Sequence, residues 1–269
     1  MRRFATLVTS SLVVGACVMG VRGEHLFKEI VPAPQLRSLT IDLPPTALRV
    51  EGVEGAVAIG YEGAWYSTAG TEKDARANAA QPKILVNYNS AGAGEIVAHV
   101  PLQVENLVDL ELHRMLISDR LDVEVVGRYT DIEMYGIEGY HYIDVDAGRV
   151  EVKGADRGAF VKTRTGDVVV HSSGPISAET AIGDVEIEQT GPSVDVFART
   201  RAGELTVTLP RLDNVALEIT TSGRVDIRSR ALVKVSDGDF EQILGDGSVL
   251  VELHASGDVS IFDTAWLED

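Results

Sequence analysis

Few side chains in this sequence have the types and spacing that catalysis or metal binding requires. The six histidines lie far apart, with no two at the spacing of metal ligands, and the only cysteine is Cys17. Neither the G-x-S-x-G nucleophile motif nor a Walker-type phosphate loop occurs. We therefore predict no catalytic residue, no metal ligand and no cofactor.

The most regular carboxylates belong to five Gly-Asp pairs, at 166–167, 183–184, 238–239, 245–246 and 257–258. Stacked repeats could align such carboxylates along one edge, where they would suit Ca²⁺. The nonapeptide pattern of calcium-binding β-repeats, with its paired glycines, is missing. We therefore expect solvated turn residues, with weak divalent binding by a diffuse acidic surface as the alternative.

The overall charge excludes several classes of protein. The 269 residues include 41 acidic and 24 basic side chains, a net charge of −17, and an acidic surface repels phosphate backbones, so we predict no nucleic-acid partner. One cysteine cannot form a disulfide scaffold. No pair of carboxylates has surroundings that should separate their pKa values, so we predict that the protein is not an enzyme. A β-helix carbohydrate-active enzyme is the alternative.

Tyrosines gather in one stretch. Four of the seven, Tyr129, Tyr135, Tyr140 and Tyr142, fall within fourteen residues, and Tyr140 and Tyr142 share strand parity, so they point to the same face. Tyrosine presents an apolar body and a polar tip, which suits sugar rings or a partner protein. We predict a contact surface of Tyr135, Tyr140 and Tyr142; the alternative is an aromatic ladder that covers a strand face.

The N-terminus indicates export. Residues 1–23 combine Arg2 and Arg3 with an apolar run from Phe4 to about Val21, as in a secretory signal. Val14-Gly15-Ala16 precedes Cys17 as in a bacterial lipobox. We predict a lipoprotein signal peptide at 1–16, a lipidated Cys17 and a tether at 17–35, which would anchor an exported protein to a membrane of the cell envelope. The alternative is a secreted protein whose signal is cut at the Ala16–Cys17 bond or near Gly23.

The elements that position these residues form a repeat. Gly148, Gly166, Gly183, Gly203 and Gly223 are 18, 17, 20 and 20 residues apart, and each precedes alternating apolar residues, as does Gly257. A second alternating run lies between most of these units. We predict an all-β solenoid over 36–263 with coils of about 17–20 residues, in which these six glycines make the turns.

Other elements are expected at the edges of this repeat. Thr71 to Ala80 is Ala-rich with a threonine N-cap and is followed by Pro82, so it is a short helix or, alternatively, a loop. Residues 264–269, with Trp266 and Leu267, should cap the last coil. The 34-residue interval between Gly223 and Gly257 departs from the regular spacing and leaves the number of coils there open.

The G-[DRE]-[VL]-x-[VI] units, the Ala-rich insert and the exported N-terminus together resemble the bacterial putative-adhesin family, a β-strand-repeat domain of unknown function related to the head domain of putative autotransporter adhesins. The resemblance covers roughly 36–262 and is strongest over 147–227. It implies a right-handed single-stranded β-helix or a related β-solenoid, at the cell surface or in the periplasm, with no catalytic residues. We therefore expect a non-enzymatic envelope lipoprotein that binds a protein or carbohydrate partner in adhesion. A periplasmic sensor or scaffold module is the alternative.

Overall fold

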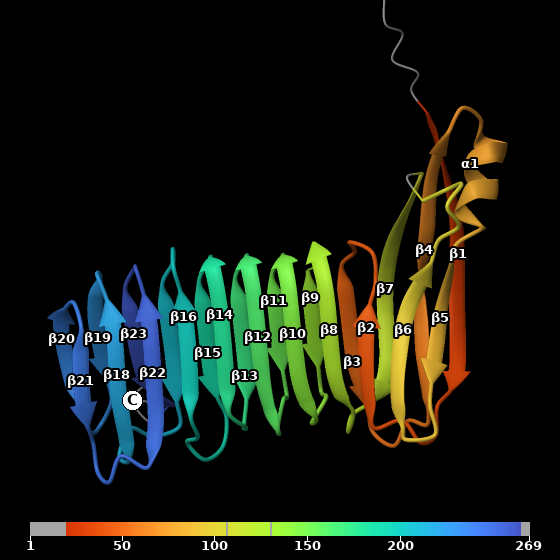
Figure 1. Cartoon of the computed structure of the whole chain (residues 1–269). Helices are drawn as coiled ribbons and strands as arrows, with labels where there is room; N and C mark the ends of the chain where they lie inside the picture. Colours follow the sequence, from red (N-terminus) through yellow and green to blue (C-terminus); the bar gives the residue numbers. More distant parts are fainter. Residues whose placement is uncertain (1–19, 106, 130, 265–269) are drawn as a thin grey trace, which may run out of the picture.

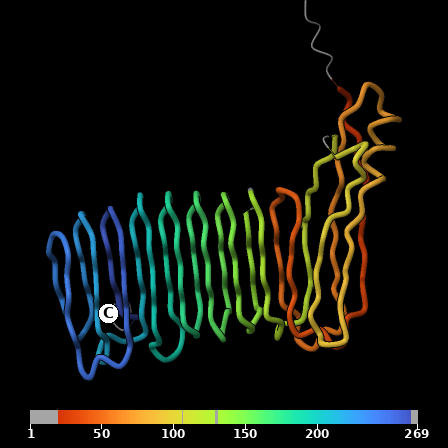
Figure 2. The backbone as a smooth tube through the Cα atoms, viewed as in Figure 1, coloured from red at the N-terminus to blue at the C-terminus, as the bar shows by residue number. Residues whose placement is uncertain are grey.

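The computed structural model describes residues 20–105, 107–129 and 131–264, which form two long β-sheets and one short helix. The strands stand side by side in a row, from the N-terminal end that carries the helix to the C-terminal end (Figures 1 and 2). Sheet A has twelve strands in the order β1-β4-β7-β3-β9-β11-β13-β15-β17-β23-β19-β20. Sheet B has eleven, in the order β21-β18-β22-β16-β14-β12-β10-β8-β2-β6-β5.

The strands of sheet A are β1 (Val21–Pro32), β3 (Leu48–Val53), β4 (Ala58–Ala69), β7 (Val108–Ser118), β9 (Ile132–Tyr135), β11 (Val150–Lys153), β13 (Val168–Ser172), β15 (Val185–Gln189), β17 (Leu205–Leu209), β19 (Arg224–Arg228), β20 (Val233–Asp237) and β23 (Val259–Asp263). The strands of sheet B are β2 (Ser38–Asp42), β5 (Lys83–Tyr88), β6 (Ala93–His99), β8 (Asp122–Tyr129), β10 (Tyr140–Ala147), β12 (Gly158–Thr165), β14 (Ile176–Ile182), β16 (Val196–Thr200), β18 (Val215–Thr221), β21 (Phe240–Ile243) and β22 (Val249–Ala255).

Each coil of the chain gives one strand to sheet B and the next to sheet A, and equivalent strands of successive coils pair in parallel. The predicted all-β solenoid is therefore confirmed. The β-branched residues that alternate along each strand point inward, where the two sheets share a core that is one side chain deep on each side. Val168, for example, pairs with Val150 on one neighbouring strand and with Val185 on the other, and all three are buried.

The predicted turn glycines form a stack where the strands of sheet B end. A Cβ at Gly166 would overlap the carbonyl of Gly148, one at Gly183 would overlap that of Gly166, and one at Gly203 would overlap that of Gly183. Gly148, Gly166 and Gly183 also have φ values of 131°, 135° and 142°. Close approach between coils is thus the requirement that Gly166, Gly183 and Gly203 share, and positive φ adds to it at Gly166 and Gly183.

Two further side-chain stacks join the coils at the same turn. The buried Thr180 donates its hydroxyl to the Gly166 carbonyl at 3.0 Å, and Thr200 donates to the Gly183 carbonyl at 2.8 Å. Asp167 accepts the backbone N–H of Asp184 at 3.0 Å. Polar side chains at the turn therefore form hydrogen bonds with the neighbouring coil. These bonds satisfy backbone N–H and C=O groups that the pairing of strands does not satisfy.

The C-terminal coils are not in chain order. Strands β22 and β23 lie between β16–β17 and β18–β19, so the last coil of the sequence occupies an inner position. The glycine stack follows the same order, because Gly257 contacts Gly203 and Gly223 contacts Gly257. This accounts for the long interval between Gly223 and Gly257. Within it, β20 pairs antiparallel with β19 in sheet A and β21 pairs antiparallel with β18 in sheet B, at the C-terminal edge.

The N-terminal end is arranged in a similar way. Strands β2 and β3 pair in parallel with β8 and β9 on one side and with β6 and β7 on the other, while β4, β5 and β1 add antiparallel strands outside them. Among the described strands, antiparallel pairing occurs only at the two ends of the row.

Helix α1 (Glu72–Ala79) confirms the helical interpretation of the Ala-rich stretch. The hydroxyl of Thr71 accepts the backbone N–H of Asp74 at 3.1 Å, as an N-cap does. Ala75 and Ala79 are buried, and the helix packs against β1 and β4. No helix in the described part of the chain is long and apolar enough to cross a membrane.

The prediction that residues 17–35 are a tether is wrong for Val21–Pro32, which form β1 and pair along their whole length with β4. The sequence does not indicate this strand, because its apolar residues Leu26 and Ile30 point outward and are 65% and 72% exposed. Cys17, the signal segment 1–16 and the proposed cap residues Trp266 and Leu267 lie outside the described residues.

Candidate functional site on the outer face of sheet B

The three tyrosines predicted as a contact surface lie on two different sheets. Tyr140 and Tyr142, on β10, point outward from sheet B and are 42% and 49% exposed. Tyr135 ends β9 in sheet A, where its ring lies 5.5 Å from both Arg49 and Lys153. Burial and the nearby carboxylates Glu151 and Glu133 raise the pKa of Tyr135. The structure therefore brings together Tyr140 and Tyr142 only.

Tyr142 belongs to a row of aromatic side chains that crosses the coils of sheet B. Its register partner on β12 is Phe160, which is 46% exposed, and the same register continues through Ser177 on β14 to Phe197 on β16. We call Tyr142, Phe160 and Phe197 the aromatic row. Phe197 is only partly exposed, and its ring centre lies 6.0 Å from that of His254. Aromatic rings exposed on a regular sheet, as those of Tyr142 and Phe160 are, form a flat apolar surface with a polar border, which is typical of a contact site.

The clustering of tyrosines does not reveal Phe160 and Phe197, but the position of these residues in the repeat does. Tyr142, Phe160 and Phe197 each stand six residues before a turn glycine, namely Gly148, Gly166 and Gly203. Equal distance from stacked glycines places side chains on the same row of the sheet. Position in the repeat, and not residue type, therefore identifies the row.

Tyr140 extends this face toward the start of β10. The Arg157 guanidinium lies 4.4 Å from the centre of the Tyr140 ring, and its Nη1 forms an ion pair with Asp122 at 2.9 Å. The same Asp122 carboxylate accepts the backbone N–H of Tyr140 at 3.0 Å. A cation held over the ring fixes its orientation, so Tyr140 borders the aromatic row in a defined position.

Charged side chains occupy the next positions along the same strands. Asp144, Lys162, Glu179 and Arg199 alternate in sign across β10, β12, β14 and β16. Nearer the turn, a groove of about 430 Å³ opens between the strands. Its lining residues are Asp144, Val145, Asp146, Lys162, Thr163, Arg164, Glu179, Thr180, Ala181, Arg199 and Arg201. This volume lies in the range of small-ligand sites.

The aspartates of the Gly-Asp pairs at the neighbouring turn are engaged by the backbone. Asp184 accepts the N–H of Glu204 at 2.9 Å, and Asp258 accepts the N–H of Arg224 at 2.8 Å. These aspartates are exposed turn residues, and Asp167, Asp184 and Asp258 also join successive coils through the backbone. In the described ranges, no group of three or more His, Cys, Asp or Glu side chains is placed to hold a metal ion.

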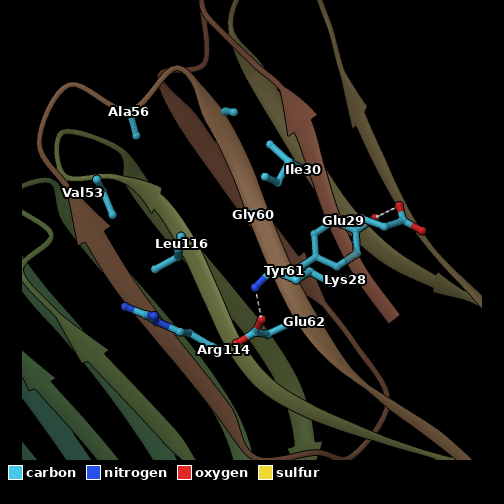
Figure 3. A pocket seen from close by; sticks show the side chains of 11 residues that line it. Lys28, Glu29, Ile30, Val53, Ala56, Gly60, Tyr61, Glu62, Arg114 and Leu116 are labelled. Atoms are coloured by element: carbon cyan, nitrogen blue, oxygen red, sulfur yellow. Dashed lines mark hydrogen bonds and ion pairs between the residues drawn. The ribbon is translucent and has the colours of Figure 1, made fainter. Parts of the chain in front are cut away.

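A second cavity lies on the outer face of sheet A near the N-terminal end (Figure 3). It has a volume of about 230 Å³, and Ile30, Val53 and Leu116 form part of its wall. Lys28 and Glu62 form an ion pair across it at 2.7 Å, and Tyr61 donates its hydroxyl to Glu29 at 2.7 Å. Burial and the Glu29 carboxylate raise the pKa of Tyr61, which stays neutral. The polar groups pair with one another, so this cavity offers an apolar wall and no activated group.

His141 is the one fully buried histidine among the described residues and belongs to the core, not to the outer face. Its Nε2 donates to the carbonyl of Ile137 at 2.9 Å, whereas Nδ1 is buried with no hydrogen-bond partner. Burial lowers the pKa of His141 to about 4. The imidazole is therefore a neutral structural group.

No protein-family model and no curated protein matches the chain. Solved structures similar to it include a putative cell adhesion protein from Clostridium sporogenes, at 15% identity and a TM-score of 0.36, which covers 90% of this chain and 100% of that chain. A putative adhesin from Bacteroides fragilis has 13% identity and a TM-score of 0.40, with 89% and 97% covered. One from Parabacteroides merdae has 7% identity and a TM-score of 0.23, with 89% and 96% covered. These structural neighbours are thus described as adhesins or cell adhesion proteins, the class named by the sequence resemblance.

Proposed function

We propose that this protein is a non-enzymatic module of the cell envelope, anchored by a lipid on Cys17, which binds carbohydrate through the outer face of sheet B. The observation that carries this proposal is the aromatic row, where Tyr142 and Phe160 stand on adjacent strands and are about half exposed. Rings of this kind bury apolar area without a large loss of side-chain entropy. A polysaccharide or glycan presents matching apolar ring faces.

The start of β1 supports processing at Cys17. Val21 begins β1, and the backbone of Gly23 lies against Ala75 and Arg76 of α1, where a Cβ would overlap them. A cut near Gly23 would remove the residues that pair with Ser67, Thr68 and Ala69 of β4. A cut before Cys17 keeps the strand whole and leaves the lipid a few residues from the N-terminal end of the solenoid.

Binding to envelope polysaccharides tests the site. The double variant Tyr142→Ser/Phe160→Ser should bind at least about tenfold more weakly than the wild type, because it removes the two most exposed rings of the row. Tyr135→Ser is the matched control, since it makes the same kind of change on the opposite sheet. Circular dichroism should show all three proteins folded. Equal binding by the double variant and the wild type would reject this face as the site.

Metabolic labelling with an alkyne palmitate tests the anchor. The wild type should be labelled and Cys17→Ser should not, because acylation needs the thiol. Equal labelling of both proteins, or of neither, would reject acylation at Cys17. Protease treatment of intact cells then separates display at the surface, where the protein is digested, from a position in the periplasm.

A further inference from the structure

The outer face of sheet B contains a trough with two similar walls. Along β12 the outward side chains are Phe160, Lys162 and Arg164, and along β16 and the residue after it they are Phe197, Arg199 and Arg201. Each wall therefore runs aromatic, basic, basic in the same direction. Parallel register places the two walls on either side of β14.

The floor of the trough is β14, whose outward side chains are Ser177, Glu179 and Ala181. Ser177 lies between the two phenylalanines, and Glu179 lies between Lys162 and Arg199. Ala181 lines the 430 Å³ groove together with Arg164 and Arg201. Ser177 and Ala181 are small and the wall side chains are long, which accounts for the hollow at the two ends of the floor. At the Ala181 end the floor itself carries no acid, and Asp146 of β10 lines the groove beside Arg164.

The basic groups of the walls are largely available to a ligand. Arg164 approaches Asp146 of β10 at 3.4 Å, and its side chain is 76% exposed. For Lys162, Arg199 and Arg201 no ion pair forms with the described residues of the chain. The four basic side chains outnumber the three carboxylates that line the same groove, Asp144, Asp146 and Glu179, so this strip is weakly positive on a protein with a net charge of −17.

We infer that this trough binds an acidic glycan, with sugar rings against Phe160 and Phe197 and a carboxylate between Arg164 and Arg201. The inference rests on the proposed function and adds the chemical class of the ligand. A guanidinium matches a carboxylate with two parallel hydrogen bonds, which a neutral sugar cannot accept in the same way. Glu179 is in register with Lys162 and Arg199 at the middle of the trough, away from the two arginines that would bind the carboxylate.

Purified protein, oligogalacturonate and its methyl ester provide the test, because esterification removes the charge and keeps the sugar chain. Calorimetry should show that the wild type binds the acid about tenfold or more tightly than the ester, in line with the loss of a charge-assisted bond. Arg164→Gln/Arg201→Gln should lose this preference. Arg224→Gln, an exposed arginine of sheet A, should retain it. Affinity for the acid should fall as salt is added.

Equal affinity for acid and ester, or an unchanged preference in Arg164→Gln/Arg201→Gln, would overturn the inference. If the wild type binds the neutral ester and Tyr142→Ser/Phe160→Ser does not, the proposed carbohydrate binding by the aromatic row still holds. Vesicles of phosphatidylglycerol in phosphatidylcholine form a separate arm. Arginine-dependent binding to these vesicles without binding to oligogalacturonate would assign the trough to a lipid headgroup and overturn the glycan assignment.

Discussion

At the scale of single residues, the turn glycines are fixed by the distance between coils. The backbone of Gly183 lies so close to the Gly166 carbonyl that any side chain must push two coils apart, and its φ of 142° adds strain for an L-residue. A glycine in this position makes the turn and also allows the two coils to come into close contact.

Gly183→Ala should therefore lower the free energy of unfolding by about 1–3 kcal/mol. Gly70→Ala is the matched control, because a Cβ there meets no atom within 4 Å, and its effect should stay within about 0.5 kcal/mol. Thermal and urea denaturation measure both. An equal effect of the two substitutions would contradict the close approach between coils.

His141 makes stability depend on pH. Burial lowers the pKa of its imidazole to about 4 from 6.5, so the unfolded chain binds a proton more readily than the folded one. Stability supplied by the neutral ring is complete above pH 6.5 and is lost as the pH falls toward 4. This contribution is roughly 3 kcal/mol.

His141→Gln should remove this part of the acid sensitivity, because glutamine does not titrate. The difference in unfolding free energy between wild type and variant should shift by roughly 3 kcal/mol between pH 7 and pH 4. His99→Gln, at an exposed histidine, should follow the wild-type curve. Parallel curves for the wild type and His141→Gln would show that His141 is not buried as a neutral group.

At the scale of elements, the position of β22 and β23 determines which strands are neighbours. Ser260 of β23 is in register with Thr206 of β17 on one side and with Asp226 of β19 on the other. If the coils followed chain order, Thr206 and Asp226 would be adjacent instead.

Cysteine pairs distinguish these arrangements, in a Cys17→Ser background that has no other thiol. Thr206→Cys/Ser260→Cys should form a disulfide on mild oxidation, because adjacent strands are about 4.8 Å apart. Thr206→Cys/Asp226→Cys should stay reduced, since the two strands are then about 9.6 Å apart, beyond the reach of a disulfide. Mass spectrometry of tryptic peptides reports both. The reverse pattern would show that the coils follow chain order.

The repeat was predictable from sequence because each coil uses the same local pattern. Glycine spacing and alternating apolar residues gave the strands from Val150 to Ile227, and Thr71 with the alanines gave α1. The order of the last coils was not predictable, since Gly257 can stack equally well on Gly203 or on Gly223 as far as sequence shows. β1 was also missed, because long-range pairing with β4 and not its own alternation makes it a strand.

The candidate site was predicted in part. Tyr140 and Tyr142 were found by clustering, but Tyr135 was grouped with them although the turn at Gly136 ends a strand of the other sheet. Phe160, Phe197 and the arginines of the trough are scattered along the chain. Only the stacking of coils places them side by side, so a residue-by-residue search could not join them.

At the scale of the whole molecule, the C-terminal coil fills a gap between two others. Val251, Leu253, Val259 and Ile261 are completely buried there. Without β22 and β23, the apolar edges of β16–β17 and β18–β19 would be left without a neighbour.

Deletion of residues 249–269 should therefore give a protein that aggregates and binds a hydrophobic dye, as open strand edges do. The full-length protein is the control. Size-exclusion chromatography compares the two. A monomeric and stable protein without residues 249–269 would contradict the inner position of the last coil.

The inner position of β22 and β23 also makes folding depend on the completion of the chain. The residues that fill the gap follow β19 in the chain, so they leave the ribosome after the coils on both sides of the gap. In the folded structure coils β16–β17 and β18–β19 each pair with β22–β23 and not with each other. A chain that stops before β22 therefore leaves the strand edges of β16–β17 and β18–β19 open, and open edges are where other chains pair.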